Sequence, residues 1–539
     1  MKKKFNEYDS FNLSDINRQV LDRWNKEHLF EQSMKVREGC PSFVFYEGPP
    51  SANGMPGIHH VMARTIKDIF CRYKTMKGFH VKRKAGWDTH GLPVELGVEK
   101  ALGITKEDIG KKISVDDYNA ACRREVMKYT KEWENLTNSM GYWVDMNDPY
   151  ITYDNRYIES AWWLLSQLHK KGYLYKGYTI QPYSPAAGTG LSTHELNQPG
   201  CYRDVKDTTV TAAFKIEDPR PEMTEWGTPC FLAWTTTPWT LPSNTALCVG
   251  PKIEYVCVQT YNPYTGEKIS AVLAKERLSA YFKAEGAEMP LDEYKPGDKI
   301  VPYRVVGSYI GNDLLGMHYQ QLMPWVKPVE RIDANVPGFV QDYAAANPEK
   351  VFSVGKDKFV ELEAEAFRVI PGDYVTTEDG TGIVHIAPTF GADDAKVAKL
   401  AGIPSLFMIN RRGETRPMVD LTGKYYTIDE CAPEFVDKCV NVAAYEKHAG
   451  DYVKNAYDPK FNVDGKYDEA AASKSEDLNI ILCMEMKQAG TAFKIEKHVH
   501  NYPHCWRTDK PVLYYPLDSW FIRTTSAREA LMANNETIK

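Results

Sequence analysis

A strand, a loop of small residues and a helix follow one another between residues 43 and 78. Residues 43–46 are apolar and β-rich, the loop after them is dense in Gly, Pro and Asn, and apolar residues then recur every three or four positions. That spacing predicts a helix with one buried face that ends at Gly78. Free backbone N–H groups and the positive end of the helix dipole would both face the loop, so the sequence predicts a place for phosphate.

Two imidazoles, His59 and His60, stand at the start of this predicted helix. They can donate hydrogen bonds to phosphoryl oxygens and stabilise charge that grows in a transition state. The alternative interpretation is a loop that crosses a sheet edge and carries two surface histidines, since glycine-rich loops are common.

Two longer motifs belong to the same stretch. Residues 46–54 read Tyr-Glu-Gly-Pro-Pro-Ser-Ala-Asn-Gly, and residues 86–95 read Gly-Trp-Asp-Thr-His-Gly-Leu-Pro-Val-Glu. Their content and order resemble class I aminoacyl-tRNA synthetases, and among these the isoleucine enzymes, over most of the chain. His90 discriminates, because the valine enzymes would carry a Gly-x-Asp-His-Ala-Gly type sequence there and the leucine enzymes Gly-Trp-Asp-Ala-Phe-Gly.

The resemblance implies an α/β fold in which a class I synthetase Rossmann-type nucleotide-binding domain is interrupted by a β-rich editing domain. It implies ATP-dependent activation of isoleucine, with Mg²⁺ accompanying the ATP, and transfer to the isoleucine tRNA. By resemblance, ATP binding falls on Gly54, Gly57, His59 and His60, the two histidines also being catalytic, and isoleucine binding falls on Pro49, Asp88 and Trp520.

The first signature departs from the family pattern His-x-Gly-His. Here residues 57–60 read Gly-Ile-His-His, so the first histidine and the glycine have changed places. The family glycine lets ATP approach the backbone, which a residue without Cβ allows. Either the loop shifts so that His59 supplies the lost imidazole, or nucleotide binding is damaged. We favour the first, because the number of imidazoles is kept.

Composition bounds the class of protein. With 539 residues the chain is too long for one core, so two or three domains are expected. No apolar run approaches the roughly 18 residues that span a bilayer, and eleven cysteines without a Cys-x-x-Cys pair fit a reducing cytoplasm. The net charge of −6 argues against a dedicated nucleic-acid binder. A tRNA would rely on local patches such as Lys-Arg-Lys at 82–84, which is equally well a solvated strand end.

Two helices are expected outside the motifs. Ser14 is a suitable N-cap for the first. The second runs from about Asn155 to Lys171, where apolar residues at helical spacing predict that Trp162 and Trp163 are core residues.

From about Cys201 the sequence changes to short alternating runs with frequent Gly and Pro, which predicts a β-rich inserted domain. The expected organisation is a catalytic domain over 1–200, the editing insertion over 201–400, a connection of uncertain structure over 401–497 and a truncated return to the catalytic domain over 498–539. Within the connection, the polar residues 454–474 are expected to be exposed.

Two segments of the insertion carry polar groups suited to hydrolysis. Residues 234–244 contain three consecutive threonines, and residues 380–394 contain a histidine and two aspartates. Such groups can orient a water against an ester and anchor an ammonium, although threonines in strands are usually packing residues. Both segments resemble the editing site of the isoleucine, valine and leucine enzymes. The resemblance implies these roles: Thr235, Thr236 and Thr237 line the site, His385 contacts the terminal adenosine or a water, and Asp394, with Asp393 as the alternative, binds the α-amino group.

Many relatives carry two Cys-x-x-Cys pairs that together make a tetrahedral zinc site. The corresponding positions here are Ser184, Ala187, Cys505 and Thr508. One thiolate cannot hold a structural zinc, so no zinc is predicted there. The nearby group of His498, His500, His504 and Cys505 permits a metal interpretation, but its spacing matches no common zinc pattern.

The chain contains neither a Lys-Met-Ser-Lys-Ser loop nor a helical anticodon-binding region after residue 498. We therefore expect the N-terminal part of a longer, monomeric protein, with little or no activation and a complete editing site. One alternative is a hydrolase that acts on mischarged tRNA by itself, which deacylation without ATP would support. The other is a catalytically inactive binding protein on this fold, which ATP affinity without turnover would support.

Overall fold

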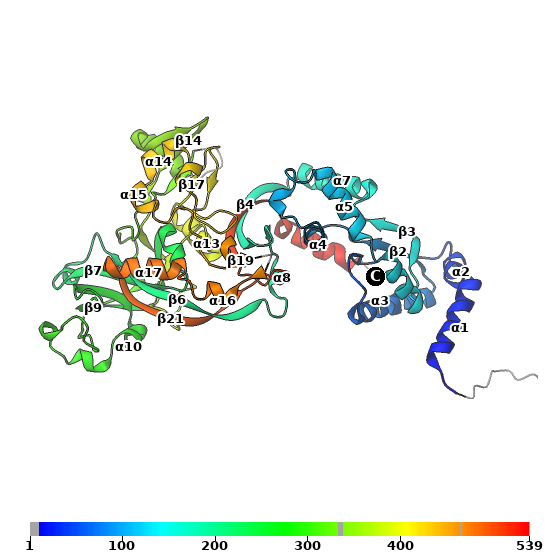
Figure 1. The fold of residues 1–539 in the computed structure, drawn as a ribbon, viewed down its shortest axis with the longest axis horizontal. Helices are drawn as coiled ribbons and strands as arrows, with labels where there is room; N and C mark the ends of the chain where they lie inside the picture. Colours follow the sequence, from blue (N-terminus) through cyan, green and yellow to red (C-terminus); the bar gives the residue numbers. More distant parts are fainter. Residues whose placement is uncertain (1–9, 333–337, 464–465, 538–539) are drawn as a thin grey trace, which may run out of the picture. The chain divides into compact units, whose positions relative to one another are not determined.

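The computed structural model describes residues 10–332, 338–463 and 466–537, and the chain divides into two compact units (Figure 1). The first comprises Met1–Tyr175 and Phe521–Lys539, and the second comprises Lys176–Trp520. The divisions expected at residues 200, 400 and 497 all fall inside the second unit. Residues 1–9 and 538–539, the ends of the first and last expected segments, lie outside the described residues.

The first unit is built on a parallel three-stranded sheet of order β1-β2-β3. Helix α3 connects β1 to β2, and α4 to α6 connect β2 to β3, as parallel neighbours require. The strand, loop and helix predicted over 43–78 are thereby confirmed. The elements are α1 (Leu13–Lys26), α2 (Leu29–Lys35), β1 (Ser42–Tyr46), α3 (Ile58–Met76), β2 (His80–Trp87), α4 (Leu92–Leu102), α5 (Val115–Val126), α6 (Thr130–Ser139), β3 (Asp145–Ile151), α7 (Asn155–Lys170) and α18 (Arg528–Glu536).

The predicted burial of two helices in this unit is wrong. Helix α3 buries Arg64, Cys71 and Thr75, whereas its apolar stripe is exposed, Phe70 for example at 64%. Helix α7 has the expected span but no buried residue, and Trp162 is 70% exposed. Helical spacing aligns apolar residues on one face, but it does not supply an element of the chain to cover that face.

Two local predictions also differ from the structure. The N-cap of α1 is Asn12, whose side chain accepts a hydrogen bond from the backbone of Asp15, so Ser14 lies inside the helix. The Lys-Arg-Lys triplet is not a basic surface patch, because Arg83 is 3% exposed and donates to Thr75 Oγ1 at 2.8 Å and Asp68 Oδ1 at 3.3 Å.

The second unit is β-rich, as predicted from residue 201 onward. Its largest sheet has the order β11-β9-β10-β7-β6-β21, and smaller sheets have the orders β15-β8-β16 and β12-β14-β13. Strands β4 (Leu174–Ser184) and β22 (Leu513–Ile522) cross its two limits. The other strands are β5 (Thr189–Gly190), β6 (Tyr202–Lys215), β7 (Thr228–Thr235), β8 (Ala246–Val249), β9 (Glu254–Tyr261), β10 (Lys268–Ala274), β11 (Arg304–Ile310), β12 (Val329–Arg331), β13 (Val351–Val354), β14 (Asp357–Glu361), β15 (Arg368–Pro371), β16 (Ile383–Ile386), β17 (Met408–Ile409), β18 (Thr415–Arg416), β19 (Asn462–Val463), β20 (Lys466–Tyr467) and β21 (Ala492–Pro503).

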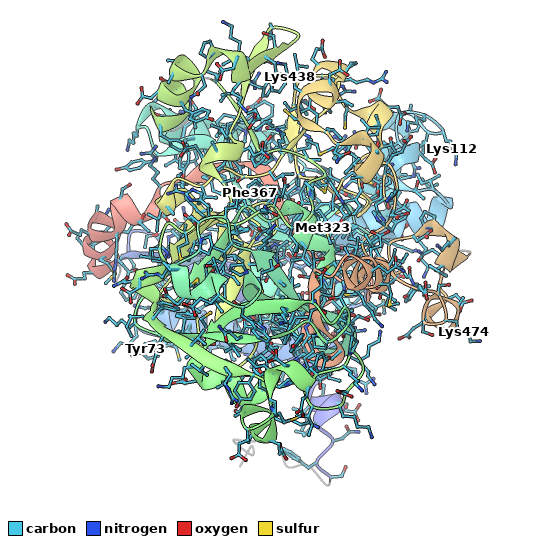
Figure 2. All side chains as sticks on the ribbon, turned by 90° about the vertical axis from the view of Figure 1, so that its left-hand side faces the viewer. Tyr73, Lys112, Met323, Phe367, Lys438 and Lys474 are labelled. Carbon is cyan, nitrogen blue, oxygen red and sulfur yellow. The ribbon has the colours of Figure 1, made fainter. Side chains whose placement is uncertain are left out.

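The helices of this unit are mostly short. They are α8 (Thr193–Leu196), α9 (Pro221–Thr224), α10 (Leu278–Tyr281), α11 (Gly311–Leu314), α12 (Gly338–Ala346), α13 (Ala392–Ala401), α14 (Pro433–Cys439), α15 (Val442–Tyr445), α16 (Glu469–Ala472) and α17 (Leu478–Gln488). Figure 2 shows Met323 and Phe367 inside the unit and Lys438 and Lys474 at its surface. Among the described residues no helix is both long and apolar enough to cross a membrane.

Strand β7 lies in the middle of the core. Phe231 and Ala233 contribute to one buried cluster, and Cys230 and Leu232 contribute to another. Because successive side chains of a strand point to opposite faces, both faces of β7 are covered. This burial fixes the strand that delivers Thr235, its last residue.

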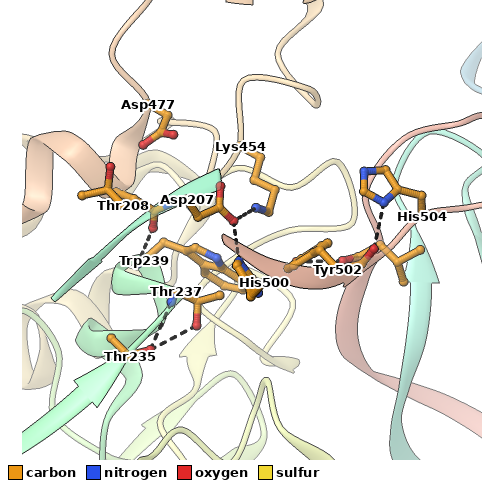
Figure 3. Close-up of polar contacts among 12 residues, drawn as sticks. Asp207, Thr208, Thr235, Thr237, Trp239, Lys454, Asp477, His500, Tyr502 and His504 are labelled. Carbon is orange, nitrogen blue, oxygen red and sulfur yellow. Dashed lines mark hydrogen bonds and ion pairs between the residues drawn. The ribbon is translucent and has the colours of Figure 1, made fainter. Parts of the chain in front are cut away.

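Strands β6 and β21 form a long antiparallel ribbon in which Tyr202 pairs with Pro503 and Ala212 with Ala492. This pairing explains why residues near 200 and 497 belong to one unit. Asp207 of the ribbon accepts from Lys454 Nζ at 3.3 Å and lies 3.1 Å from His500 Nε2 (Figure 3). The exposure expected for residues 454–474 is therefore wrong at Lys454, whose side chain is 11% exposed; residues 464–465 lie outside the described residues.

Candidate functional site

His60 is held in one orientation at the start of α3. The backbone N–H of Gly57, the N-cap, donates to His60 Nδ1 at 2.9 Å, and the ring meets Trp133 edge-on with centroids 4.6 Å apart. Burial lowers the pKa of His60, and the neighbouring His59 and Arg64 lower it further. His60 is thus a neutral imidazole whose proton lies on Nε2, which leaves that atom as a hydrogen-bond donor.

The exchanged histidine, His59, is exposed and lies against His60, with ring centroids 3.8 Å apart. A Cβ at position 57 would lie 2.9 Å from His59 Cε1, so a side chain at 57 would require the exposed His59 ring to move. The structure therefore brings the two imidazoles together in the first turn of the helix.

Three residues that the sequence analysis did not single out fix the loop before α3. Glu47 is 2% exposed and forms an ion pair with Lys67 Nζ at 2.5 Å, and Tyr142 donates its hydroxyl proton to the same carboxylate. Trp133 Nε1 donates to the carbonyl of Gly54 at 3.0 Å. Glu47 was detectable as a charge inside the first motif, whereas nothing in the sequence points to Tyr142.

Asp88 directly follows β2, and its backbone N–H donates to the carbonyl of Pro50 at 3.0 Å. The loop containing Pro49 and the segment containing Asp88 thus meet at the carboxyl ends of two parallel strands, where α/β sheets bind ligands. Trp520 is the last residue of the second unit and is 61% exposed.

The second unit brings the predicted threonines and His385 together. The hydroxyls of Thr235 and Thr237 lie 3.3 Å apart (Figure 3), and Thr237 Oγ1 lies 3.4 Å from Thr240 Oγ1. Thr240 Oγ1 in turn lies 3.1 Å from His385 Nε2. Thr240 joins the two segments; it was present in the motif but was not assigned a role. Thr236 is half-buried, and among the described contacts no hydrogen bond joins it to these hydroxyls.

His385 is a buried, neutral imidazole. Burial lowers its pKa to about 4, so the ring is neutral at pH 7. The hydroxyl of Thr240 donates to the carbonyl of Thr237 at 2.8 Å, and it therefore accepts from His385 Nε2–H. The remaining ring nitrogen, Nδ1, is a buried acceptor without a hydrogen-bond partner.

Asp394 lies in the first turn of α13 and accepts from the backbone N–H of Ala387 at 2.9 Å. Burial raises its pKa to about 6, whereas Asp393 is exposed. Ile386 packs with Ala398 of α13, so the adjacent His385 points to the opposite face of the strand. Asp394 is thus bonded to the backbone two residues after His385. Among the described residues no hydrogen bond joins Asp394 to Thr235, Thr237, Thr240 or His385.

Unpaired polar atoms gather on these two segments. In the described part of the chain thirteen buried side-chain polar atoms have no hydrogen-bond partner. Four of them, Trp239 Nε1, Ser243 Oγ, His385 Nδ1 and Thr389 Oγ1, lie on the two segments, and a fifth, Thr245 Oγ1, directly follows the first segment. Buried polar groups are normally paired, so this concentration indicates a place that receives polar partners from outside the chain.

The four positions that correspond to the zinc-binding cysteines of relatives lie in two turns. Ser184 Oγ accepts from the backbone of Ala187 at 3.2 Å, and the backbone N–H of Cys505 donates to the carbonyl of Lys510 at 2.8 Å. The imidazole of His504 lies 3.0 Å from the carbonyl of Tyr502. No group of three or more metal-ligating side chains is assembled within the described ranges.

Comparison with known proteins gives the family. The family model described as tRNA synthetases class I (I, L, M and V) matches residues 19–539. The isoleucine–tRNA ligase of Bacteroides thetaiotaomicron is 70% identical over 538 residues, which are 100% of this chain and 44% of that protein. That of Porphyromonas gingivalis is 62% identical over 540 residues, 100% of this chain and 44% of that protein. The chain therefore spans less than half the length of the curated relatives that it matches.

One solved structure, titled "The crystal structure of GlLeuRS-CP1", aligns with 36% of this chain and 64% of its own at 14% identity and a TM-score of 0.21, a likeness too low to support an argument. The family model, by contrast, covers nearly the whole sequence. This chain belongs to the class I tRNA synthetases of the I, L, M and V group.

Proposed function

We propose that this chain is the part of an isoleucine–tRNA ligase that carries the nucleotide-binding loop and the hydrolytic editing site. The isoleucine specificity is supported by His90 within the motif at 86–95 and by 70% identity to an isoleucine–tRNA ligase over 538 residues. The complete protein would activate isoleucine with ATP and Mg²⁺ and charge the isoleucine tRNA. We further propose that it is a cytoplasmic monomer.

The proposed activation site lies at the carboxyl ends of β1 and β2. His60 Nε2–H, the α3 N-terminus and His59 would face ATP, and Gly54 and Gly57 would let it approach the backbone. Asp88 would hold the isoleucine ammonium and Pro49 would contact the isoleucine side chain, while the contact expected of Trp520 stays a prediction. These donors suit a nucleotide triphosphate, which Mg²⁺ accompanies, because catalysis of this step consists mainly of positioning and of stabilising phosphate charge.

The proposed architecture is a Rossmann-type domain interrupted by an editing domain. The parallel order β1-β2-β3 with its crossover helices supports the first part of this proposal. The ribbon of β6 and β21, through which the chain enters and leaves the β-rich region, supports the second. We keep residues 1–200 and 498–539 as the catalytic part, 201–400 as the editing part and 401–497 as the connection.

A hydrolytic site has a physical reason. An apolar pocket gains only about 1 to 3 kcal/mol from one methylene, so it cannot reject valine strongly by binding alone; isoleucine against valine is the standard example of this limit. We propose that Thr235, Thr237 and Thr240 line a second pocket that admits valine. His385 Nδ1 would accept a proton from water or from the terminal adenosine, and Asp394 would hold the substrate ammonium.

The observation that carries this proposal is the connected group of threonine hydroxyls and His385, in which the second ring nitrogen of His385 is buried without a hydrogen-bond partner. The test is hydrolysis of valine-charged and isoleucine-charged isoleucine tRNA by this chain, without ATP. We expect valine to be released faster than isoleucine. Equal spontaneous loss from both substrates, with or without the folded chain, would contradict the proposal.

A further inference from the structure

The backbone of Trp239 is held from two sides. Trp239 lies in the 3-10 turn Pro238–Ser243, between Thr237 and Thr240. Its N–H donates to Asn479 Oδ1 at 3.0 Å, and its carbonyl accepts from the hydroxyl of Tyr425 at 2.6 Å. Asn479 is 2% exposed and Tyr425 is fully buried. Water cannot replace either partner without rearrangement, so each lost bond would leave a buried backbone group unpaired.

Both partners come from the connection, where the sequence contained no recognisable motif. Asn479 is 240 positions from Trp239, and Tyr425 is 186 positions away. Asn479 lies in the first turn of α17, which is capped by Asp477 through a hydrogen bond from the backbone of Ile480. The acceptor oxygen that Trp239 uses therefore lies on a capped helix.

The turn that these two bonds hold contains Thr240, which links the threonine hydroxyls to His385. Thr240 reaches His385 Nε2 at 3.1 Å, and the Trp239 ring meets Phe390 edge-on with centroids 4.9 Å apart. A displacement of the turn by about 1 Å would lengthen the contact between Thr240 and His385 beyond hydrogen-bond range. Trp239 lies beside Thr237 in Figure 3.

We propose that Asn479 and Tyr425 are positioning residues for the editing reaction: by holding both polar groups of the Trp239 peptide, they set the distance between the threonine hydroxyls and His385. Neither side chain has a hydrogen bond to Thr237, Thr240 or His385 among the described contacts. They act through Trp239. This inference rests on the proposed editing function.

The first test compares two replacements of Asn479. Asn479→Leu removes the acceptor with little change in volume, and Asn479→Asp keeps an oxygen there at a helix N-terminus, where a carboxylate is favourable. We expect Asn479→Leu to lower kcat for hydrolysis of valine-charged tRNA about tenfold with KM changed less than twofold, as for loss of one buried hydrogen bond. Asn479→Asp should recover most of that loss. Tyr425→Phe should lower kcat in the same way.

The matched control is Asn262→Leu. Asn262 is 1% exposed and donates to the backbone carbonyls of Gly490 and Ala492, so the variant loses a comparable buried amide without touching Trp239. Its kcat per folded molecule should equal that of the parent chain. A folded Asn479→Leu protein with the parent kcat, or an equal loss of kcat in Asn262→Leu, would overturn the inference.

Hydrogen exchange of the peptide spanning residues 235–245 separates this inference from the proposed function. We expect exchange in that peptide to be at least tenfold faster in Asn479→Leu than in the parent chain and unchanged in Asn262→Leu. If the parent chain hydrolyses neither substrate, the proposed function is contradicted, while the exchange result still decides whether Asn479 holds the turn. Unchanged exchange in Asn479→Leu would overturn the positioning role.

Discussion

His448 Nε2 lies 3.1 Å from Glu485 Oε2, although 37 positions separate the two residues. The other ring nitrogen lies 3.2 Å from Asp451 Oδ2, and the ring stacks on Trp325 with centroids 5.0 Å apart. Both nitrogens therefore face carboxylates. Burial lowers the pKa of His448, but the hydrogen bonds to Asp451 and Glu485 outweigh it and raise the pKa above its ordinary value. This imidazole joins α17 to the segment after α15.

Replacing His448 by Gln should reduce stability in a pH-dependent way. Because the folded pKa is raised, the stabilisation by the charged ring is fully present below the unfolded pKa of about 6.5 and is lost as pH rises through the folded pKa. We expect a charge-dependent deficit of about 1 kcal/mol at pH 6, since solvent screens the half-exposed carboxylates, and a smaller deficit at pH 9. Denaturant unfolding of both proteins at the two pH values measures this. A deficit that is the same at both would refute the charged pair.

Lys454→Met should be strongly destabilising. The side chains of Lys454, Asp207 and His500 are 11%, 15% and 16% exposed, and removal of one partner of a buried pair costs about 3 to 5 kcal/mol. The double variant Asp207→Asn, Lys454→Met should lose less free energy of unfolding than the two single variants lose together. Chemical denaturation measures both quantities, with the exposed Lys447→Met as the control. Strict additivity would mean that the two side chains do not interact.

Asp394→Asn should stabilise the protein at neutral pH. The raised pKa of about 6 means that the folded state disfavours the charged carboxylate. This cost is fully present above about pH 6 and disappears below the unfolded pKa of about 3.9. We expect the free energy of unfolding to increase by roughly 2 kcal/mol at pH 7.5 and to be unchanged near pH 4. Thermal unfolding measures it, and the exposed Asp393→Asn should give no comparable gain.

His59→Gly should weaken ATP binding if His59 supplies the imidazole missing from the family pattern. Loss of one hydrogen bond to a charged phosphate corresponds to about a tenfold change. Equilibrium dialysis of ATP against the parent and variant chains measures the affinity. His28→Gly is the control, because His28 is an exposed imidazole of the same unit with φ of 50°, a conformation that glycine adopts readily. Tighter ATP binding by His59→Gly would show that His59 obstructs the site.

The predictions that succeeded used local patterns. The strand, loop and helix around His60 and the span of α7 follow from periodicity and from breakers such as Gly78 and Gly172. The contact between Thr240 and His385 joins two residues 145 positions apart. Its two segments were assigned to one site from their motifs, because composition gives no information about such a contact.

The predictions that failed depended on distant partners. Lys454 lies in a polar stretch, yet its carboxylate partner Asp207 is 247 positions away, and no local signal records such a pair. Trp162 has helical spacing typical of a core residue but is exposed, because periodicity does not reveal whether the same chain covers the face. Asn479 could not be found for the same reason: a single asparagine at a helix start is usually only a capping residue.

The most direct test of the account compares the two adjacent carboxylates of α13 in the hydrolysis reaction. Initial rates of release from valine-charged and isoleucine-charged isoleucine tRNA are measured for the parent chain, for Asp394→Ala and for Asp393→Ala. We expect the parent chain to release valine at least tenfold faster than isoleucine, because the second pocket admits the smaller side chain. The rate of valine release should fall about tenfold in Asp394→Ala, which loses the hydrogen-bonded anchor of the ammonium, and should stay at the parent rate in Asp393→Ala. A parent rate of valine release in Asp394→Ala, or a loss of rate only in Asp393→Ala, would contradict the assignment of the site.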